Sequence, residues 1–223
     1  MRPCSPVLLF SCLVVAASST QTPAVAAPGV STTAYRAILV LEEDFARFIA
    51  HRLDLSADGL PLRGEAAFVE VERAERTLEH LRLRYVALLT GDPNEEIRHL
   101  VLLRLAELHL DLGARIRRIP APQSDVEGEG QRWAKRLTQR AVPLEGVGVG
   151  MLEQIARLPE GTASVQRFRN RAQLYAVLHA AEDGVLGPAQ VATLRLELAR
   201  DATYPAPRRL LEVRQVGRRA ARW

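Results

Sequence analysis

Cysteine and lysine are almost absent from this sequence of 223 residues. The only two cysteines, Cys4 and Cys12, lie close to the start. A chain that had lost this first segment would therefore have no disulfide and no thiol chemistry, even in an oxidising compartment. Lys135 is the only lysine, and every other basic side chain is arginine. This bias is typical of a GC-rich bacterial genome and does not by itself predict phosphate binding.

Aromatic residues and catalytic motifs are also scarce. Aromatics make up 5% of the chain and the formal net charge is only +4, so a base-stacking nucleic-acid surface is not expected. The sequence has no nucleophile elbow, phosphate-binding loop or dinucleotide glycine pattern. Glu96 and His99 form a single Glu-x-x-His pair, whereas a di-metal bundle needs two such pairs. The sequence therefore predicts a protein without enzymatic activity.

The longest apolar run lies at the N-terminus. Val7–Ala17 follows a basic Arg2, is too short to span a bilayer, and precedes the small residues Ala24-Val25-Ala26. This arrangement predicts a signal peptide over residues 1–26 and a secreted or periplasmic mature protein. Cys12 offers the alternative of a lipoprotein.

Most of the remaining chain has the apolar spacing of amphipathic helices. Residues 65–89 give the clearest stripe, with apolar positions three and four residues apart and charged positions between them. Residues 97–116 are apolar on more than one face, which predicts packing on two sides. Between these two segments, Asp92 is expected to cap the second helix and Pro93 to occupy its first position. The short connection predicts antiparallel neighbours.

The predicted fold class is therefore all-α, built from antiparallel helix pairs in a solenoid- or bundle-like arrangement. Further helices are expected over residues 35–53, 131–141, 162–181 and 189–199, whereas the Gly-rich residues 143–150 are expected to break the structure. The predicted organisation is a lead-in (27–33), an N-terminal helical region (34–118), a linker (119–131), a C-terminal helical region (132–203) and a basic tail (204–223).

One stretch combines a turn with regularly spaced oxygen ligands. Asp54, Ser56 and Asp58 occupy the first, third and fifth positions, Gly59 the sixth, and Glu65 the twelfth. Alternate side chains of a tightly wound loop can converge on a hard cation, and a glycine accepts the positive φ of the turn. A polar turn between two helices explains the same residues without a metal.

The spacing of this stretch resembles the EF-hand calcium loop. The resemblance implies that Asp54, Ser56 and Asp58 supply side-chain oxygens, Leu60 a backbone carbonyl, and Glu65 a bidentate carboxylate to Ca²⁺. Pro61 departs from the family, because the eighth position normally offers a backbone N–H to a neighbouring loop. Three carboxylates and no paired loop predict weak binding, on the order of 10⁻⁴–10⁻³ M.

Residues 102–113 resemble the first helix of a tetratricopeptide repeat, through Leu105-Ala106 and Gly113. His109 stands where that family has tyrosine, and no 34-residue recurrence follows. This resemblance implies a helical scaffold for protein–protein interaction. Asp183–Pro188 resembles both a degenerate EF-hand loop and the turn of small peptidoglycan-binding domains, which implies a third possibility, a protein associated with the cell wall.

These observations predict a Ca²⁺-responsive helical binding module for an unknown protein partner. The alternative is a tetratricopeptide-like scaffold that needs no metal. The basic tail, rich in arginine from Arg208 onward, could also contact an anionic envelope surface.

Overall fold

Helices make up most of the chain that the structure describes, which confirms the all-α prediction. The computed structural model describes residues 32–56, 58–90, 94–123, 126–157, 163–181, 188–200, 207 and 210. Its helices are α1 (Thr32–Ala50), α2 (Glu65–Leu89), α3 (Glu95–Arg117), α4 (Glu129–Arg157), α5 (Ala163–Ala181) and α6 (Pro188–Ala199). The predicted signal peptide, the Asp183–Gly187 turn and almost all of the basic tail lie outside these residues.

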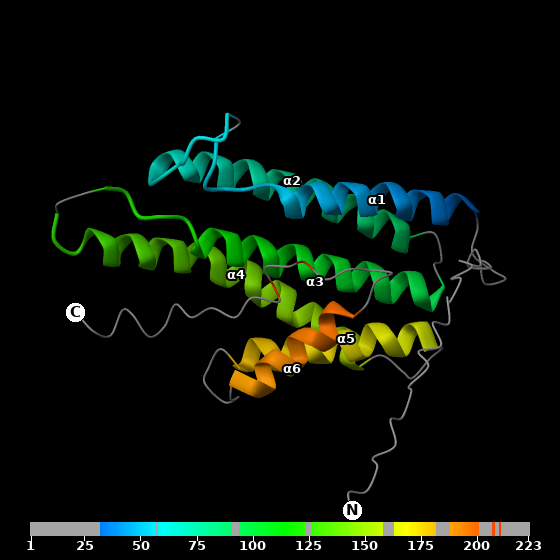
Figure 1. Cartoon of the computed structure of the whole chain (residues 1–223). Coiled ribbons are helices and arrows are strands. Elements are labelled where there is room, and N and C mark those ends of the chain that lie inside the picture. Colours follow the sequence, from blue (N-terminus) through cyan, green and yellow to red (C-terminus); the bar gives the residue numbers. More distant parts are fainter. Residues whose placement is uncertain are drawn as a thin grey trace, which may run out of the picture. The chain divides into compact units, whose positions relative to one another are not determined.

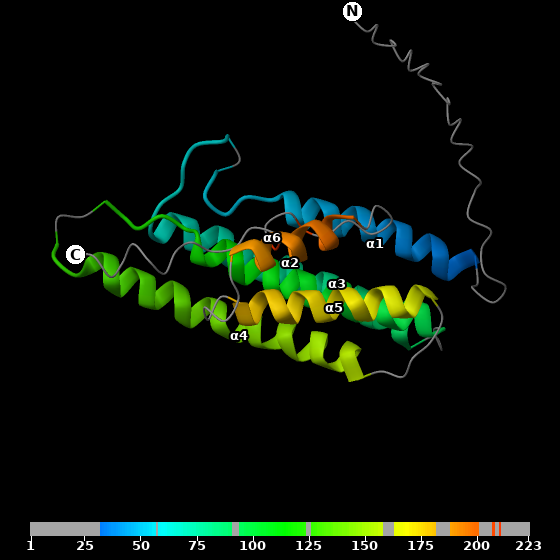
Figure 2. The same ribbon diagram turned by 60° about the horizontal axis from the view of Figure 1, so that its bottom comes forward.

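Helix α3 lies at the centre of the arrangement. It packs against α1, α2, α4 and α5, while α6 packs on α5. α1 and α2 run side by side on one side of α3, and α5 and α6 lie on the other (Figures 1 and 2). All six helices belong to one compact unit, Ser31–Trp223. No helix within the described ranges is both long and apolar enough to cross a membrane.

The amphipathic pattern of α2 is confirmed, as is the all-round burial of α3. The helix over 65–89 begins and ends where its periodicity predicts, and its apolar stripe is buried at Val71, Ala74, Leu78, Leu81 and Tyr85. On α3 nearly every residue from His99 to Ile116 is buried. Because α3 is covered from several directions, the burial of its leucines supplies much of the apolar surface that stabilises the fold.

The predicted break at residues 143–150 is wrong. α4 runs without interruption through Pro143 and the glycines that follow. A Cβ on Gly148 would lie 2.7 Å from Leu110 Cγ and 3.0 Å from the carbonyl oxygen of Ala106. The glycine therefore lets α4 approach α3 closely, and packing between these helices outweighs the low helix propensity of the segment.

The start of α3 also differs from the expectation. Asn94, and not Asp92, is the N-cap, and its Oδ1 accepts a hydrogen bond of 2.9 Å from the backbone N–H of Ile97. Both residue types satisfy the free N–H groups of a first helical turn equally well, so the sequence alone does not choose between them.

A buried ionic network joins three helices in the core. Glu107 of α3 is fully buried and accepts hydrogen bonds from Arg104 (2.7 Å), from Tyr175 of α5 (2.7 Å) and from Arg171 of α5. Arg104 also donates to Glu42 of α1, with Nε 2.9 Å from Oε1. The helical spacing of residues 162–181 predicts that Arg167, Arg169 and Arg171 face outward. For Arg171 this prediction is wrong, because its side chain pairs with Glu107 and is only 3% exposed.

Candidate functional site

A third buried arginine, Arg115, fixes the end of α1. Arg115 of α3 donates to the backbone carbonyls of Phe48 and His51, each at 3.0 Å, and its guanidinium lies 4.4 Å from the centre of the Phe48 ring. Asp111, which is fully buried, lies 2.8 Å from Arg115 Nε. The last carbonyls of a helix have no partner within the helix. Arg115 supplies a hydrogen-bond donor to these carbonyls and thereby holds Phe48 and His51 in place.

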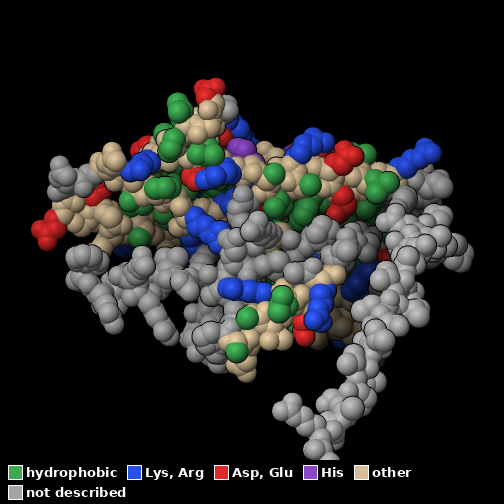
Figure 3. Space-filling view, viewed as in Figure 1, with side chains coloured by type: hydrophobic (Ala, Val, Ile, Leu, Met, Phe, Trp, Pro, Cys, Tyr) green, Lys and Arg blue, Asp and Glu red, His purple; other side chains and the backbone are tan. Residues whose placement is uncertain are grey.

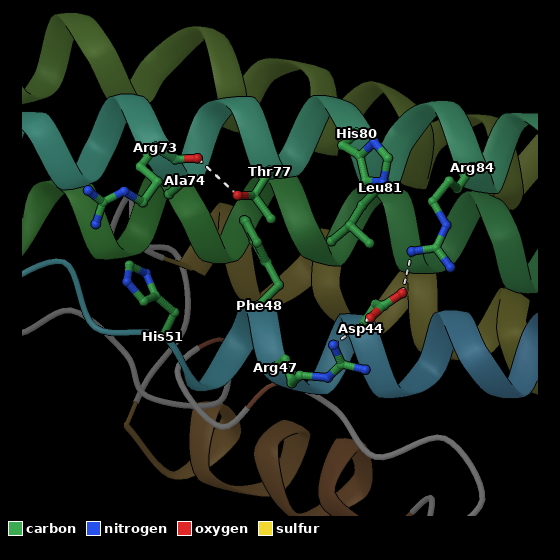
Figure 4. Close-up of a pocket in the computed structure, with 10 residues that line it drawn as sticks. All are labelled: Asp44, Arg47, Phe48, His51, Arg73, Ala74, Thr77, His80, Leu81 and Arg84. Atoms are coloured by element: carbon green, nitrogen blue, oxygen red, sulfur yellow. Dashed lines mark hydrogen bonds and ion pairs between the residues drawn. The ribbon is translucent and has the colours of Figure 1, made fainter. Parts of the chain in front are cut away.

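Phe48 and His51 both line a groove between α1 and α2 with a volume of about 390 Å³. Figure 4 shows side chains from both helices pointing toward it. Its floor consists of Phe48, Ala74 and Leu81, which are each no more than 4% exposed. Its polar lining consists of Asp44, Arg47, His51, Arg73, Thr77, His80 and Arg84. An apolar floor with a charged border is an arrangement typical of binding surfaces.

The arginines of the groove stand over acidic side chains. Arg73 donates from Nη1 to both carboxylate oxygens of Glu70, at 2.7 and 2.9 Å. Arg47 Nη1 lies 3.0 Å from Asp44, and Arg84 also donates to Asp44. The acidic side chains are only 12% and 16% exposed, whereas those of Arg73 and Arg47 are 61% and 72% exposed. At the Arg73 end the side chain that faces solvent is therefore cationic. At the other end Arg47 also lies 3.8 Å from Glu43, which is itself exposed, so the solvent-facing charges there are mixed.

The groove lies on a surface of mixed charge. In the space-filling view, blue, red and green side chains alternate over the side of the molecule formed by α1 and α2 (Figure 3). This groove was not predicted from the sequence. Arg73, Thr77 and Arg84 occur at positions i, i+4 and i+11, so their common stripe on α2 could be read from the sequence, but the position of α1 beside it could not.

The loop predicted to bind calcium has the expected turn but a tightly self-bonded backbone. Gly59 has a φ of 76°, as a turn at this position requires. Ser56 N–H donates to the carbonyl of Leu60 at 2.8 Å, and Leu60 N–H donates to Ser56 Oγ at 3.1 Å. The Leu60 carbonyl and the Ser56 hydroxyl, both proposed as cation ligands, are therefore already hydrogen-bonded within the loop.

The carboxylates of this loop point to different partners. Asp54 accepts two hydrogen bonds from Arg52, at 3.0 and 2.6 Å, and Asp58 is exposed. Glu65 pairs with Arg136 of α4, which also lies 4.3 Å from the centre of the Phe68 ring. Hydrogen bonding from Arg136 lowers the pKa of Glu65. Within the described residues, no group of three or more His, Cys, Asp or Glu side chains is arranged to hold a metal ion.

Asp54, Ser56, Asp58, Leu60 and Glu65 thus share one loop and the start of α2, and all of them except Asp58 have a hydrogen-bond partner given above. Ca²⁺ binding here remains a prediction. No protein family model, no curated protein and no solved structure matches the chain.

Proposed function

We propose that this protein is a non-catalytic helical module that binds a protein partner, with the groove between α1 and α2 as its binding surface. The groove itself is the observation that carries the proposal. It combines an apolar floor at Phe48, Ala74 and Leu81 with a border of exposed guanidinium groups. A helix of a partner laid in such a groove would bury apolar side chains and keep its polar side chains at the border.

The buried carboxylates of α3 pair with arginines of the core, which supports a binding role and not a catalytic one. Glu107 and Asp111 are fully buried and paired with arginines. A general acid or base must come within hydrogen-bond reach of its substrate, and both carboxylates are occupied in joining helices. This interpretation corresponds to the helical-scaffold function that the 102–113 segment implies, with the contact surface on α1 and α2.

A site-specific photo-crosslinker tests the proposal. With Cys4 and Cys12 replaced by serine or removed, a cysteine introduced as Thr77→Cys is the only thiol and carries the label into the groove. Arg76→Cys, on the same helix but outside the groove lining, is the matched control. We expect a discrete adduct from cells of the source organism only with the Thr77 label, competed by unlabelled protein. The same adducts from both positions would exclude the groove as the binding surface.

Calcium binding at Asp54–Glu65 is the second candidate function, favoured by the positive φ of Gly59 and the exposed Asp58. Because Glu65 pairs with Arg136, the cation must compete with that guanidinium. We expect calorimetry to give a dissociation constant on the order of 10⁻⁴–10⁻³ M for Ca²⁺ and weaker binding of Mg²⁺.

Two variants distinguish this loop site from adventitious binding. Glu65→Gln should abolish the calcium heat while leaving the protein folded, and Arg136→Ala should tighten calcium binding by removing the competitor. Calcium should also raise the melting temperature, because a ligand of the folded form stabilises it. The absence of heat at millimolar Ca²⁺, or a thermal shift that survives Glu65→Gln, would leave the loop as a turn.

We also propose that the module is exported, with removal of residues 1–26. The intact mass of the protein recovered from the cell envelope tests this, and a lipidated N-terminus at Cys12 would contradict it.

A further inference from the structure

We infer that the occupant of the α1–α2 groove is an acidic amphipathic helix, with carboxylates at both ends of its apolar stripe. This inference rests on the proposed function and specifies the partner's chemistry. The distribution of charge along the groove carries it. Figure 4 shows Arg73 and His51 at one end and the Arg84–Asp44–Arg47 group at the other, with Phe48, Thr77 and Leu81 between them.

The arginines of the groove are more exposed than Glu70 and Asp44, and this difference sets the sign of the charge expected on the ligand. Glu70 and Asp44 lie beneath the arginines that they bind, with 12% and 16% of their side chains exposed. A ligand entering from solvent therefore meets exposed guanidinium groups at both ends, with the exposed Glu43 beside Arg47 at one of them. Arg73 donates to Glu70 from Nη1, and its Nη2 and Nε carry further N–H groups of the kind that bind a carboxylate. Guanidinium forks bind carboxylates in a bidentate geometry.

The length of the groove sets the spacing of the ligand's charges. Arg73 and Arg84 are eleven positions apart on α2, which corresponds to about 16 Å along a helix axis at a rise of about 1.5 Å per residue. A helix lying along the groove would place carboxylates about seven to eleven residues apart, with two or three apolar side chains between them. Those apolar side chains would cover Phe48, Ala74 and Leu81.

Neither the tail nor the lead-in of this chain suits the groove, because neither has acidic residues for the arginines at both ends to bind. The tail from Arg208 to Trp223 carries six arginines and one glutamate, so it has the same sign as the groove border. The lead-in (27–33) has no charged residue to place against either end. Charge complementarity therefore favours an acidic helix from another protein.

Fluorescence anisotropy with synthetic peptides tests the inference on the full chain. The probe is a labelled helical peptide of about 18 residues with a leucine stripe flanked by glutamates at the spacing derived above. One control peptide replaces these glutamates by lysine, and the other has the acidic composition in scrambled order, without an apolar face. We expect the acidic amphipathic peptide to bind at least about tenfold more tightly than either control and to weaken with added salt.

Variants of the groove complete the test. Arg47→Glu combined with Arg73→Glu should weaken the acidic peptide about tenfold or more, because attraction becomes repulsion at both ends. Thr77→Trp fills the groove with an exposed side chain and should abolish binding of every peptide that uses it. Arg76→Glu, on α2 but outside the lining, should leave the affinity unchanged. A thermal melt of each variant establishes that it is folded.

The outcomes separate the two proposals. If the lysine peptide binds as tightly as the acidic peptide and Thr77→Trp abolishes both, the groove is a docking site but the inferred acid preference is wrong. If the scrambled acidic peptide binds equally well, the attraction is a general one of charge and the inference is overturned. If binding is insensitive to Thr77→Trp, or only a small amphiphile such as dodecanoate binds, both the acidic helix and the groove as a protein-binding surface are rejected.

Discussion

Two Arg–Glu pairs of the same chemistry and spacing occupy opposite environments. On α3, Arg104 and Glu107 are three residues apart, with N and O atoms 2.7 Å apart and side chains 1% and 0% exposed. On α2, Glu79 and Arg82 are also three residues apart, with N and O atoms 2.6 Å apart and side chains 54% and 39% exposed. The buried pair continues to Glu42 and Arg171 on other helices, whereas the exposed pair joins two residues of one helix.

The comparison shows that burial, and not the pair itself, determines what such an interaction does. Removing one member of the buried pair leaves a charge in the core without its partner, which is strongly unfavourable. Removing one member of the exposed pair leaves a charge that water solvates. The network around Glu107 therefore fixes how α1, α3 and α5 meet.

The largest expected effect is that of Glu107→Ala. This change leaves Arg104 and Arg171 buried beside each other without the carboxylate that both contact, so the free energy of unfolding should fall by about 3–5 kcal/mol. Urea denaturation monitored by circular dichroism measures it. A loss below about 1 kcal/mol would show that water reaches these arginines, and that the network does not hold the helices together.

A slightly smaller or equal loss is expected at the floor of the groove. Leu81 is 3% exposed, and Leu81→Ala removes buried methyl groups and leaves a cavity, at a cost of about 2–5 kcal/mol. The same denaturation experiment applies. If Leu81→Ala had no more effect than a surface substitution on α2, the buried face of this helix would be assigned incorrectly.

A moderate, pH-dependent effect is expected at His109, which is 6% exposed and whose Nδ1 lies 2.7 Å from the Leu105 carbonyl oxygen. Burial lowers the pKa of His109 below its ordinary value of 6.5. The unfolded chain then binds a proton more readily, so this contribution to stability is present above about pH 6.5 and is lost as the pH falls through the folded pKa.

His109→Gln should therefore reduce the decline in the free energy of unfolding on going from about pH 7.5 to about pH 5.5, relative to the unmodified protein. His80→Gln, which changes an exposed histidine of α2, is the matched control. If His109→Gln does not alter this decline, the pKa of His109 is the same in the folded protein as in the unfolded chain, and the prediction is wrong.

The smallest effect is expected for the exposed pair. Arg82→Ala should leave the stability unchanged within experimental error, because Glu79 is solvated after the loss of its partner. A clear destabilisation would remove the distinction between the two pairs. A double-mutant cycle of Glu79→Ala with Arg82→Ala would then measure their coupling.

The sequence predicted those features that depend on local periodicity. The bounds of α2 and its buried stripe follow from apolar spacing alone. The continuity of α4 could not be predicted from spacing, because the role of Gly148 depends on how close Leu110 of α3 lies. Proline and glycine indicate a break only where no other helix compensates for their low propensity.

The buried charges were missed, although the sequence contained a signal. Arg104, Glu107, Asp111 and Arg115 lie on a helix that is apolar on several faces, so they could not all reach solvent. Their spacing of three and four residues matches the geometry of ion pairs within a helix. The partners on α1 and α5, and the groove between α1 and α2, depend on tertiary packing, which spacing does not specify.

Amide hydrogen exchange of the full chain, with and without the acidic amphipathic peptide, tests the central claim most directly. A bound helix should slow exchange in residues 44–51, at the end of α1 and just after it, and in residues 73–84 of α2, which together contain every residue of the groove lining. The loop from Asp54 to Gly64 and the helices α5 and α6 should be unaffected. Protection in those other segments, with none along the groove, would contradict the assignment of the α1–α2 groove as the binding surface.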